Sequence, residues 1–88
     1  MKPSLKMQDK RVLVTGSGTG LGREIALEFA RQGADLVLHY SSTQEGALTA
    51  RNEIRTMGRR CEIFQADFAK LEDAISLGDR AIQFLGGI

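Results

Sequence analysis

The stretch Thr15-Gly16-Ser17-Gly18-Thr19-Gly20-Leu21-Gly22 decides how the rest of this 88-residue sequence is interpreted. It follows a short apolar run at 11–14 and precedes a segment with helical patterning at 23–30. Glycine lacks a Cβ atom, so its backbone reaches positive φ values and approaches an anion closely. The N–H groups and the positive dipole end of a following helix point toward that anion. A strand, a glycine turn and a helix in this order therefore predict a phosphate-binding loop.

The glycine spacing separates this loop from two other phosphate-binding motifs. Gly16, Gly20 and Gly22 form T-G-x-x-x-G-x-G, which differs from the dinucleotide fingerprint G-x-G-x-x-G. A P-loop would need a lysine and a hydroxyl residue where Leu21 and Gly22 stand. In this spacing the sequence resembles the coenzyme loop of the short-chain dehydrogenase/reductase family.

Composition and charge exclude several other classes of protein. The formal net charge is +1, and the 12 basic and 11 acidic residues form no basic stripe for nucleic acid. The single cysteine, Cys61, excludes an internal disulfide, and with the single histidine, His39, it makes no set of metal ligands. No apolar run approaches the roughly 18 residues of a membrane span. The sequence therefore predicts one cytoplasmic domain without a metal, a nucleic-acid partner or a membrane anchor.

Strands and helices are expected to alternate three times along the chain. Apolar runs predict the strands, and apolar residues spaced by three and four predict the helices. Residues 1–9 are predicted to be a flexible lead-in, and residues 10–88 to form the domain. The expected elements are strand 10–15, helix 21–32, strand 35–40, a helix between an S-x-x-E capping box at 42–45 and Gly58, strand 61–66, and helix 71–85.

Each expected helix carries an apolar stripe that should face the sheet. Gly33 is expected to end the first helix as a C-terminal cap. The stripes are Leu21, Ile25 and Phe29 with Ala26 and Ala30 beside them, then Ala47, Ala50, Ile54 and Met57, then Leu71, Ala74, Ile75, Ile82 and Leu85.

This alternation of elements indicates βαβ units and a parallel sheet. Right-handed crossovers with strand order 3-2-1 place the first two helices on one face and the third helix on the other. In a doubly wound fold a fourth strand would pair with the free edge of the first strand and create the crevice for a dinucleotide. The sequence stops at Ile88, where that strand should begin. The expected fold is therefore α/β, a partial Rossmann fold with a three-stranded parallel sheet, helices on both faces, and a truncated dinucleotide-binding domain.

The resemblance to the short-chain dehydrogenase/reductase family extends from Arg11 to Ile88 and covers the family's N-terminal portion. It implies that loop 15–22 contacts the coenzyme and that the turn Ala66-Asp67-Phe68 lies beside the adenine ring. The candidate coenzyme-binding residues are Thr15, Gly16, Ser17, Gly18, Gly20, Leu21, Gly22, Tyr40, Ser41, Ser42, Asp67 and Phe68.

Several of these positions also have a purely structural interpretation. Gly18 could be present because the loop tolerates only small residues, and the Thr15 hydroxyl could close the end of the strand. Asp67 is a residue type that starts turns or caps helices. His39 is expected to be a packed or an edge strand residue rather than a ligand, and Cys61 to be a small buried apolar residue.

The choice of coenzyme depends on the end of the second strand. In NAD-preferring Rossmann proteins an acidic residue there binds the ribose hydroxyls, whereas this sequence has Tyr40-Ser41-Ser42. No carboxylate would repel a 2′-phosphate, and the serine hydroxyls could donate to one. The usual arginine is missing at Ser41, and Arg23 is expected to be solvated rather than bound to phosphate. The sequence favours NADP(H) over NAD(H).

The catalytic pattern that the resemblance implies is missing. The family has an Asn-Asn-Ala-Gly strand end, a serine and a Tyr-x-x-x-Lys pair. Tyr40 is the only tyrosine, and Gln44 rather than lysine stands four residues further on. Asn52, the only asparagine, lies within a helical pattern. We therefore predict no catalytic residue and no turnover by this chain alone.

Two functions remain open from the sequence. In the first, the chain is the coenzyme-binding segment of an NAD(P)-dependent short-chain oxidoreductase, which transfers hydride between NADP(H) and a carbonyl or alcohol once a C-terminal part is supplied. In the second, it is a non-enzymatic or vestigial Rossmann-like module for nucleotide binding or interaction. Exposed strand edges favour association, so both predict a homo-oligomer or a complementing C-terminal segment.

Overall fold

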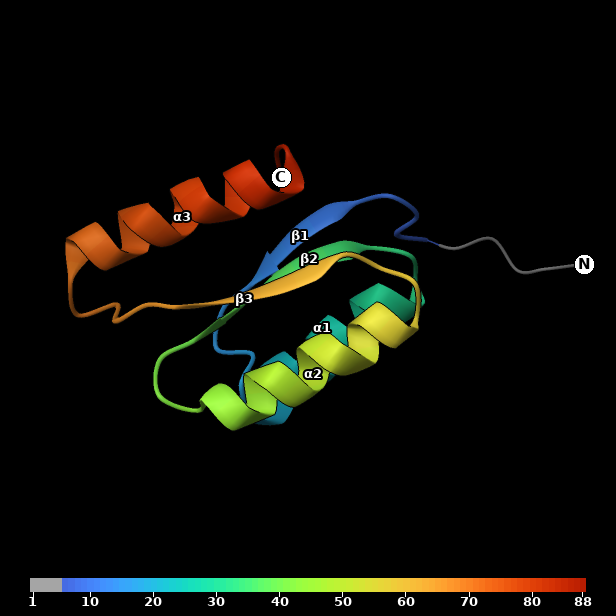
Figure 1. Ribbon diagram of the computed structural model, residues 1–88, viewed down its shortest axis with the longest axis horizontal. Coiled ribbons are helices and arrows are strands. Elements are labelled where there is room, and N and C mark those ends of the chain that lie inside the picture. Colours follow the sequence, from blue (N-terminus) through green and yellow to red (C-terminus); the bar gives the residue numbers. More distant parts are fainter. Residues whose placement is uncertain (1–5) are drawn as a thin grey trace, which may run out of the picture.

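A computed structural model describes residues 6–88, in which three strands and three helices alternate along the chain (Figure 1). Their bounds confirm the predicted order and lie within two residues of the predicted ends. The elements are β1 (Arg11–Val14), α1 (Gly20–Arg31), β2 (Asp35–Tyr40), α2 (Gln44–Thr56), β3 (Cys61–Gln65) and α3 (Leu71–Leu85).

The segment before β1 is described from Lys6 onward, so residues 1–5 of the predicted lead-in lie outside the described residues. The backbone N–H of Met7 donates to the Gln32 carbonyl at 2.9 Å, and that of Asp9 donates to the Gly33 carbonyl at 3.0 Å. These bonds attach the residues just before β1 to the C-terminal end of α1.

The three strands form one parallel sheet in the order β1-β2-β3. Leu36, Val37 and Leu38 in the middle of β2 have no exposed surface, because this strand has a neighbour on each side and helices over both faces. Within the described residues β1 pairs only with β2, and Arg11 at its start is exposed. The predicted α/β class, a partial Rossmann fold with a three-stranded parallel sheet, is confirmed.

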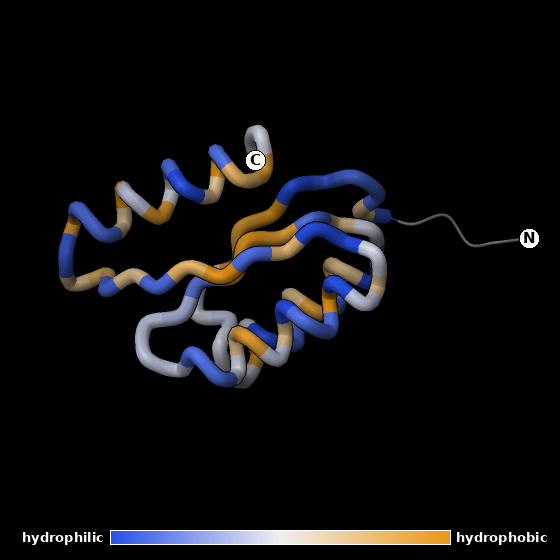
Figure 2. Tube along the Cα trace, in the orientation of Figure 1, coloured by the Kyte–Doolittle hydropathy of each residue, from blue (hydrophilic) through white to orange (hydrophobic). Residues whose placement is uncertain are grey.

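Helices cover both faces of the sheet, with α1 and α2 on one side and α3 on the other (Figure 1). Alternate side chains of β2 face opposite layers because a strand has a period of two. Leu36 and Leu38 join the larger core with α1 and α2, and Val37 joins a smaller one with Ala81 and Leu85 of α3. Figure 2 shows the strands as the hydrophobic centre between these layers. The arrangement agrees with right-handed crossovers.

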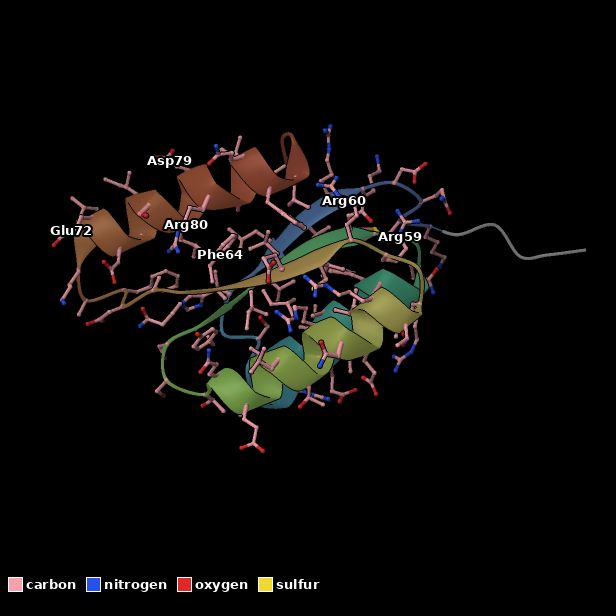
Figure 3. The ribbon with its side chains drawn as sticks, in the orientation of Figure 1. Arg59, Arg60, Phe64, Glu72, Asp79 and Arg80 are labelled. Carbon is pink, nitrogen blue, oxygen red and sulfur yellow. The ribbon has the colours of Figure 1, made fainter. Side chains whose placement is uncertain are left out.

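Two arginines fasten α3 to the third strand. Arg80 of α3 lies over the ring of Phe64 in β3, with its guanidinium carbon 4.7 Å from the ring centroid (Figure 3). It also donates to the Gln65 carbonyl at 3.1 Å. Arg60, directly before β3, lies 4.8 Å from the ring centroid of Phe84 and donates to the Phe84 carbonyl. Each cation–π contact contributes about 0.5–1 kcal/mol at such partly exposed positions.

The apolar stripes predicted for α1 and α3 are partly wrong. Five of their members are between 39% and 76% exposed, namely Leu21, Ile25, Leu71, Ile75 and Ile82. The prediction holds for Ala26 and Ala30 on α1 and for Leu85 on α3, which are buried, whereas the buried Leu27, Leu77 and Ala81 were not in the predicted stripes. Both helices carry apolar residues on more than one face, so spacing alone does not select the face that meets the sheet. On α2 the prediction holds for Ala47, Ala50 and Ile54.

The capping box predicted at 42–45 does not form. Thr43 is the N-cap residue of α2, and no side chain hydrogen-bonds the cap. A capping box needs its glutamate three positions after the cap, whereas Glu45 stands two positions after Thr43. Gly33, at a φ of 97°, follows the end of α1 as predicted.

Gly78 offers a direct test of the α3 assignment. A Cβ atom built at Gly78 would meet nothing within 4 Å, and glycine destabilises a helix interior relative to alanine. We expect Gly78→Ala to raise the free energy of unfolding by about 0.5–1 kcal/mol. Urea unfolding followed by circular dichroism measures this change, and a loss of stability would contradict a helical Gly78 with open space around it.

Candidate functional site

The glycine loop lies at the carboxyl edge of the sheet, where β1 ends. In parallel α/β sheets the carboxyl ends of the strands form the ligand-binding edge. A pocket of about 70 Å³ opens there between the loop and the residues that follow β2. It is lined by Gly16, Gly18, Thr19, Tyr40, Ser41 and Thr43. The structure therefore brings together two of the three segments that the sequence singled out.

Two glycines of the loop adopt left-handed backbone conformations. Gly16 has a φ of 63° and Gly20 has a φ of 59°, values that residues with a Cβ atom rarely adopt. A Cβ atom at either position would meet nothing within 4 Å. Glycine is therefore required at these two positions by the backbone conformation and not by lack of space.

Three other glycines allow close packing around the loop. A Cβ atom on Gly22 would overlap the carbonyl oxygen of Gly16, and one on Gly46 would overlap the carbonyl oxygen of Gly18. A Cβ atom on Gly18 itself would lie 2.7 Å from the Thr43 carbonyl oxygen. The lack of a side chain at Gly22 thus lets α1 pack closely against the loop. The lack of side chains at Gly18 and Gly46 lets the loop pack closely against the first turn of α2. Gly18 combines this packing role with a place in the pocket wall.

Ser17 and His39 support the loop from inside the protein. The Ser17 N–H donates to the His39 carbonyl at 2.9 Å, and its hydroxyl lies 3.0 Å from the carbonyl oxygens of Val14 and His39. Ser17 has no exposed surface, so this predicted coenzyme residue faces the core and does not line the pocket. The Nδ1 atom of His39, a residue 4% exposed, accepts the Gly16 N–H at 3.0 Å. The prediction of a packed histidine is confirmed.

The start of α1 presents backbone donors next to the pocket. Thr19 is the N-cap residue, no side chain hydrogen-bonds the cap, and the first turn holds no acidic residue. The first N–H groups of a helix have no partner within the helix, and the dipole makes this end positive. Leu21 is 76% exposed beside them. Arg23 forms ion pairs with Glu24 at 3.6 Å and with Glu53 of α2 at 3.9 Å.

Hydroxyl groups dominate the opposite wall of the pocket. Tyr40, half-buried, and the exposed Ser41 and Thr43 line it, whereas the neighbouring Ser42 does not. No carboxylate is among the lining residues. The Gln65 side chain donates to the Ser41 carbonyl at 3.1 Å and ties this wall to the end of β3. Uncharged hydrogen-bonding groups of this kind suit the oxygens of a ribose or a phosphate.

The turn after β3 lies next to the site and outside the pocket lining. The Asp67 carboxylate accepts the Ala69 N–H at 2.9 Å, and the Asp67 N–H donates to the Asp73 carboxylate at 2.9 Å. Asp67 therefore shapes the turn and is not the cap of α3, which is Lys70. Phe68, 50% exposed, stacks on the His39 ring with centroids 4.2 Å apart.

Thr19, Thr43, Gly46 and His39 were not among the predicted site residues. Thr19 and Thr43 occupy variable positions of their motifs, so nothing in the spacing marked them. Gly46 carried one signal, a glycine in the first turn of a predicted helix, where alanine is more favourable. Thr15, which was among them, is exposed and does not line the pocket.

Neither a metal centre nor a membrane-spanning helix is found in residues 6–88. No group of three or more His, Cys, Asp or Glu side chains in this part of the chain could hold a metal ion. None of its helices has the length and apolar character needed to cross a bilayer. The binding features at the carboxyl edge of the sheet are backbone amides and hydroxyl groups.

Cys61 lies in the larger core with 1% of its surface exposed. Burial raises the pKa of its thiol to about 12. The nucleophilic thiolate is therefore scarce near neutral pH. The prediction of a small buried apolar residue is confirmed.

We expect Cys61 to resist alkylation by iodoacetamide at pH 8 in the folded chain and to react rapidly in urea, because unfolding returns the thiol pKa to its ordinary value. Mass spectrometry of timed samples measures the two rates. Equal alkylation rates in the folded and the unfolded chain would contradict the burial of Cys61.

Residues 10–88 match the sequence profile of the short chain dehydrogenase family. The chain belongs to the short-chain dehydrogenase family. The chain is 34% identical over 83 residues to a trihydroxynaphthalene reductase of Pestalotiopsis fici, a match that covers 94% of this chain and 29% of that protein. It is 40% identical over 77 residues to a hydroxynaphthalene reductase-like protein of Metarhizium anisopliae, covering 88% of this chain and 29% of that protein.

Solved structures of short-chain dehydrogenases share the fold. A crystal structure of a short chain dehydrogenase from Burkholderia cenocepacia in complex with NADP superposes with a TM-score of 0.88 and 34% sequence identity. The match covers 98% of this chain and 34% of the Burkholderia chain. The chain therefore spans about a third of the length of the relatives that it matches. The resemblance seen in the glycine loop is confirmed at the level of the family.

Proposed function

We propose that this chain is the coenzyme-binding segment of an NADP(H)-dependent short-chain oxidoreductase, which acts by hydride transfer between NADP(H) and a carbonyl or alcohol substrate. The pocket between the glycine loop and the end of β2 carries this proposal. It combines glycines with left-handed or closely packed backbone, an uncapped helix start and hydroxyl groups. The NADP complex of the Burkholderia relative supports the same assignment.

Each part of the pocket suits a different part of a dinucleotide. The loop at Gly16, Gly18 and Thr19, with the first amides of α1, would hold the pyrophosphate, because backbone donors and the helix dipole favour anions. Tyr40, Ser41 and the adjacent Ser42 and Thr43 would hold the adenosine ribose. The turn with Asp67 and Phe68 would flank the adenine. A Cβ atom at Gly18 would press on Thr43 and narrow this cradle.

The phosphorylated coenzyme suits these walls better than the unphosphorylated one. An acidic residue at the end of the second strand binds the ribose hydroxyls in NAD-preferring proteins and would repel a 2′-phosphate. The lining here contains hydroxyl residues and no carboxylate. We therefore assign NADP(H) as the preferred coenzyme.

The proton chemistry of the reaction is assigned to residues outside this chain. Tyr40 lies in the pocket wall, and Gln44 stands where a lysine would lower its pKa. This segment would bind and orient the coenzyme, which would supply or accept the hydride when bound. The catalytic groups would come from a C-terminal segment that pairs with the open edge of β1.

A chimera tests the proposed function. The segment of the Metarhizium reductase-like protein that matches this chain is replaced by residues 10–88, and carbonyl reduction is followed by NADPH absorbance. We expect the chimera to oxidise NADPH in the presence of a hydroxynaphthalene substrate, whereas the 88-residue chain alone shows no turnover. A folded but inactive chimera that fails to bind NADPH would contradict the proposal and favour a non-enzymatic module.

A further inference from the structure

One side chain, His39 of β2, connects the segment that follows β1 with the segment that follows β3. It is the penultimate residue of β2 and is 4% exposed. Its Nδ1 atom lies 3.0 Å from the Gly16 backbone nitrogen in the glycine loop. Its Nε2 atom lies 3.0 Å from the Ala66 carbonyl oxygen, directly after β3. The ring also stacks on Phe68 with an angle of 13° between the planes. His39 therefore contacts the glycine loop and the β3 turn at the same time.

The two hydrogen-bond partners determine which nitrogen of His39 carries a hydrogen. The Gly16 N–H can only donate, so Nδ1 must present its lone pair. The Ala66 carbonyl can only accept, so Nε2 must carry the hydrogen. Only the neutral imidazole with its hydrogen on Nε2 meets both conditions. Any form with a hydrogen on Nδ1 would place two hydrogens against each other at Gly16.

The backbone carbonyl of His39 also accepts hydrogen bonds from the glycine loop. Its carbonyl oxygen accepts the Ser17 N–H at 2.9 Å, and the Ser17 hydroxyl lies 3.0 Å from it. Two consecutive loop residues, Gly16 and Ser17, are thus bonded to one residue of β2. Gly16 also has a left-handed φ of 63° and lines the pocket. The orientation of the following loop amides therefore depends on the Gly16 anchor.

We propose that His39 is a positioning residue for the coenzyme: its neutral Nε2–H imidazole fixes Gly16, and with it the glycine loop, relative to the turn after β3. As far as it concerns coenzyme affinity, this proposal rests on the function proposed above. The imidazole links the loop assigned to the pyrophosphate with the turn assigned to the adenine, so the spacing between these two binding elements is set before the coenzyme arrives. Phe68 covers the ring and limits the access of water to both hydrogen bonds.

Nitrogen NMR of the labelled 88-residue chain tests the geometry without a coenzyme. Long-range proton–nitrogen correlations report which ring nitrogen carries the hydrogen, and hydrogen exchange reports the protection of the Gly16 amide. We expect His39 to be protonated on Nε2 alone at pH 7.5 and the Gly16 amide to exchange slowly. A hydrogen on Nδ1, or an unprotected Gly16 amide, would overturn the proposal.

Two substitutions separate hydrogen bonding from packing. His39→Phe keeps the ring and its stacking but removes the acceptor for Gly16. His39→Asn places an amide oxygen where Nδ1 lies. The partly buried Gly16 N–H would lose its acceptor in His39→Phe, so we expect this variant to weaken NADPH binding about tenfold and His39→Asn to stay within about threefold of wild type. Equal losses in both variants, or unchanged binding in His39→Phe, would contradict a role through Gly16.

Val37→Ala is the matched control, because Val37 lies two residues earlier on the same face of β2 and is fully buried. It should lower the thermal midpoint without changing NADPH affinity or the protection of Gly16 relative to the core. If His39→Phe does not fold, the NADPH affinity of His39→Asn and the tautomer of His39 in the wild-type chain decide whether the proposal holds. If the wild-type chain binds no NADPH, the proposed function fails, whereas the tautomer and Gly16 exchange still decide whether His39 fixes the loop.

Discussion

Gly22→Ala is expected to weaken NADPH binding about 100-fold. A Cβ atom at this position would overlap the Gly16 carbonyl oxygen and crowd the Gly16 carbonyl carbon at 3.0 Å. Both neighbours are backbone atoms, so the loop has to move away from α1. Losing one or two charge-assisted hydrogen bonds from amides to phosphate costs about 3 kcal/mol, which corresponds to about 100-fold in affinity. Isothermal titration of the variant with NADPH measures the loss.

Gly78→Ala serves as the control for this substitution. It makes the same chemical change in a helix at a position with nothing within 4 Å, so NADPH affinity should stay at the wild-type value. A Gly22→Ala variant that binds NADPH as tightly as Gly78→Ala would show that the loop and α1 are not packed as the structure has them.

Ser41→Asp is expected to weaken NADPH binding about 30-fold and to leave NADH binding within about threefold. Ser41 lines the pocket at the end of β2 and is exposed. A carboxylate about 5 Å from a 2′-phosphate adds a repulsion of about 2 kcal/mol at an intermediate dielectric constant. The ribose hydroxyls of NADH can donate to the same carboxylate. Titrations with both coenzymes give the ratio of the two affinities.

Ser41→Asn controls for side-chain size in that experiment. It has nearly the shape of aspartate without the charge, so its preference for NADPH should remain close to wild type. If Ser41→Asp and Ser41→Asn discriminate between the coenzymes equally, the 2′-phosphate does not lie beside residue 41 and the assignment of NADP(H) to this wall is wrong.

The order of the elements and the layering of the helices were predictable from the sequence, because both follow from local patterns and from chain connectivity. Apolar runs such as Leu36–Leu38 fix a buried strand, and right-handed crossovers fix the face on which each helix lies. The rotation of α1 and α3 about their axes was not predictable. The predicted stripes included Leu21 and Leu71, which are exposed, and left out Leu27 and Leu77, which are buried.

In the candidate site, too, the features that depend on adjacent residues were predictable, and the contacts between residues far apart in the sequence were not. The glycine loop was visible because its conformation is encoded in adjacent residues. The contacts of Gly46 with Gly18 and of His39 with Gly16 join residues 23 to 28 positions apart. Such contacts depend on the register between β1 and β2, which no single motif specifies. Ser17 illustrates the converse case, because its place inside the motif suggested a ligand contact and the structure turns it toward the core.

A titration of the ¹⁵N-labelled 88-residue chain with NADPH, followed by backbone amide shifts, tests the proposed coenzyme site most directly. We predict saturable changes that concentrate at Gly16 to Gly20 and at Tyr40 to Thr43, with smaller changes at Asp67 and Phe68 and weaker binding of NADH. The absence of saturable binding, or changes centred on the opposite end of the sheet near Lys10 and Ile88, would contradict a coenzyme site at the glycine loop.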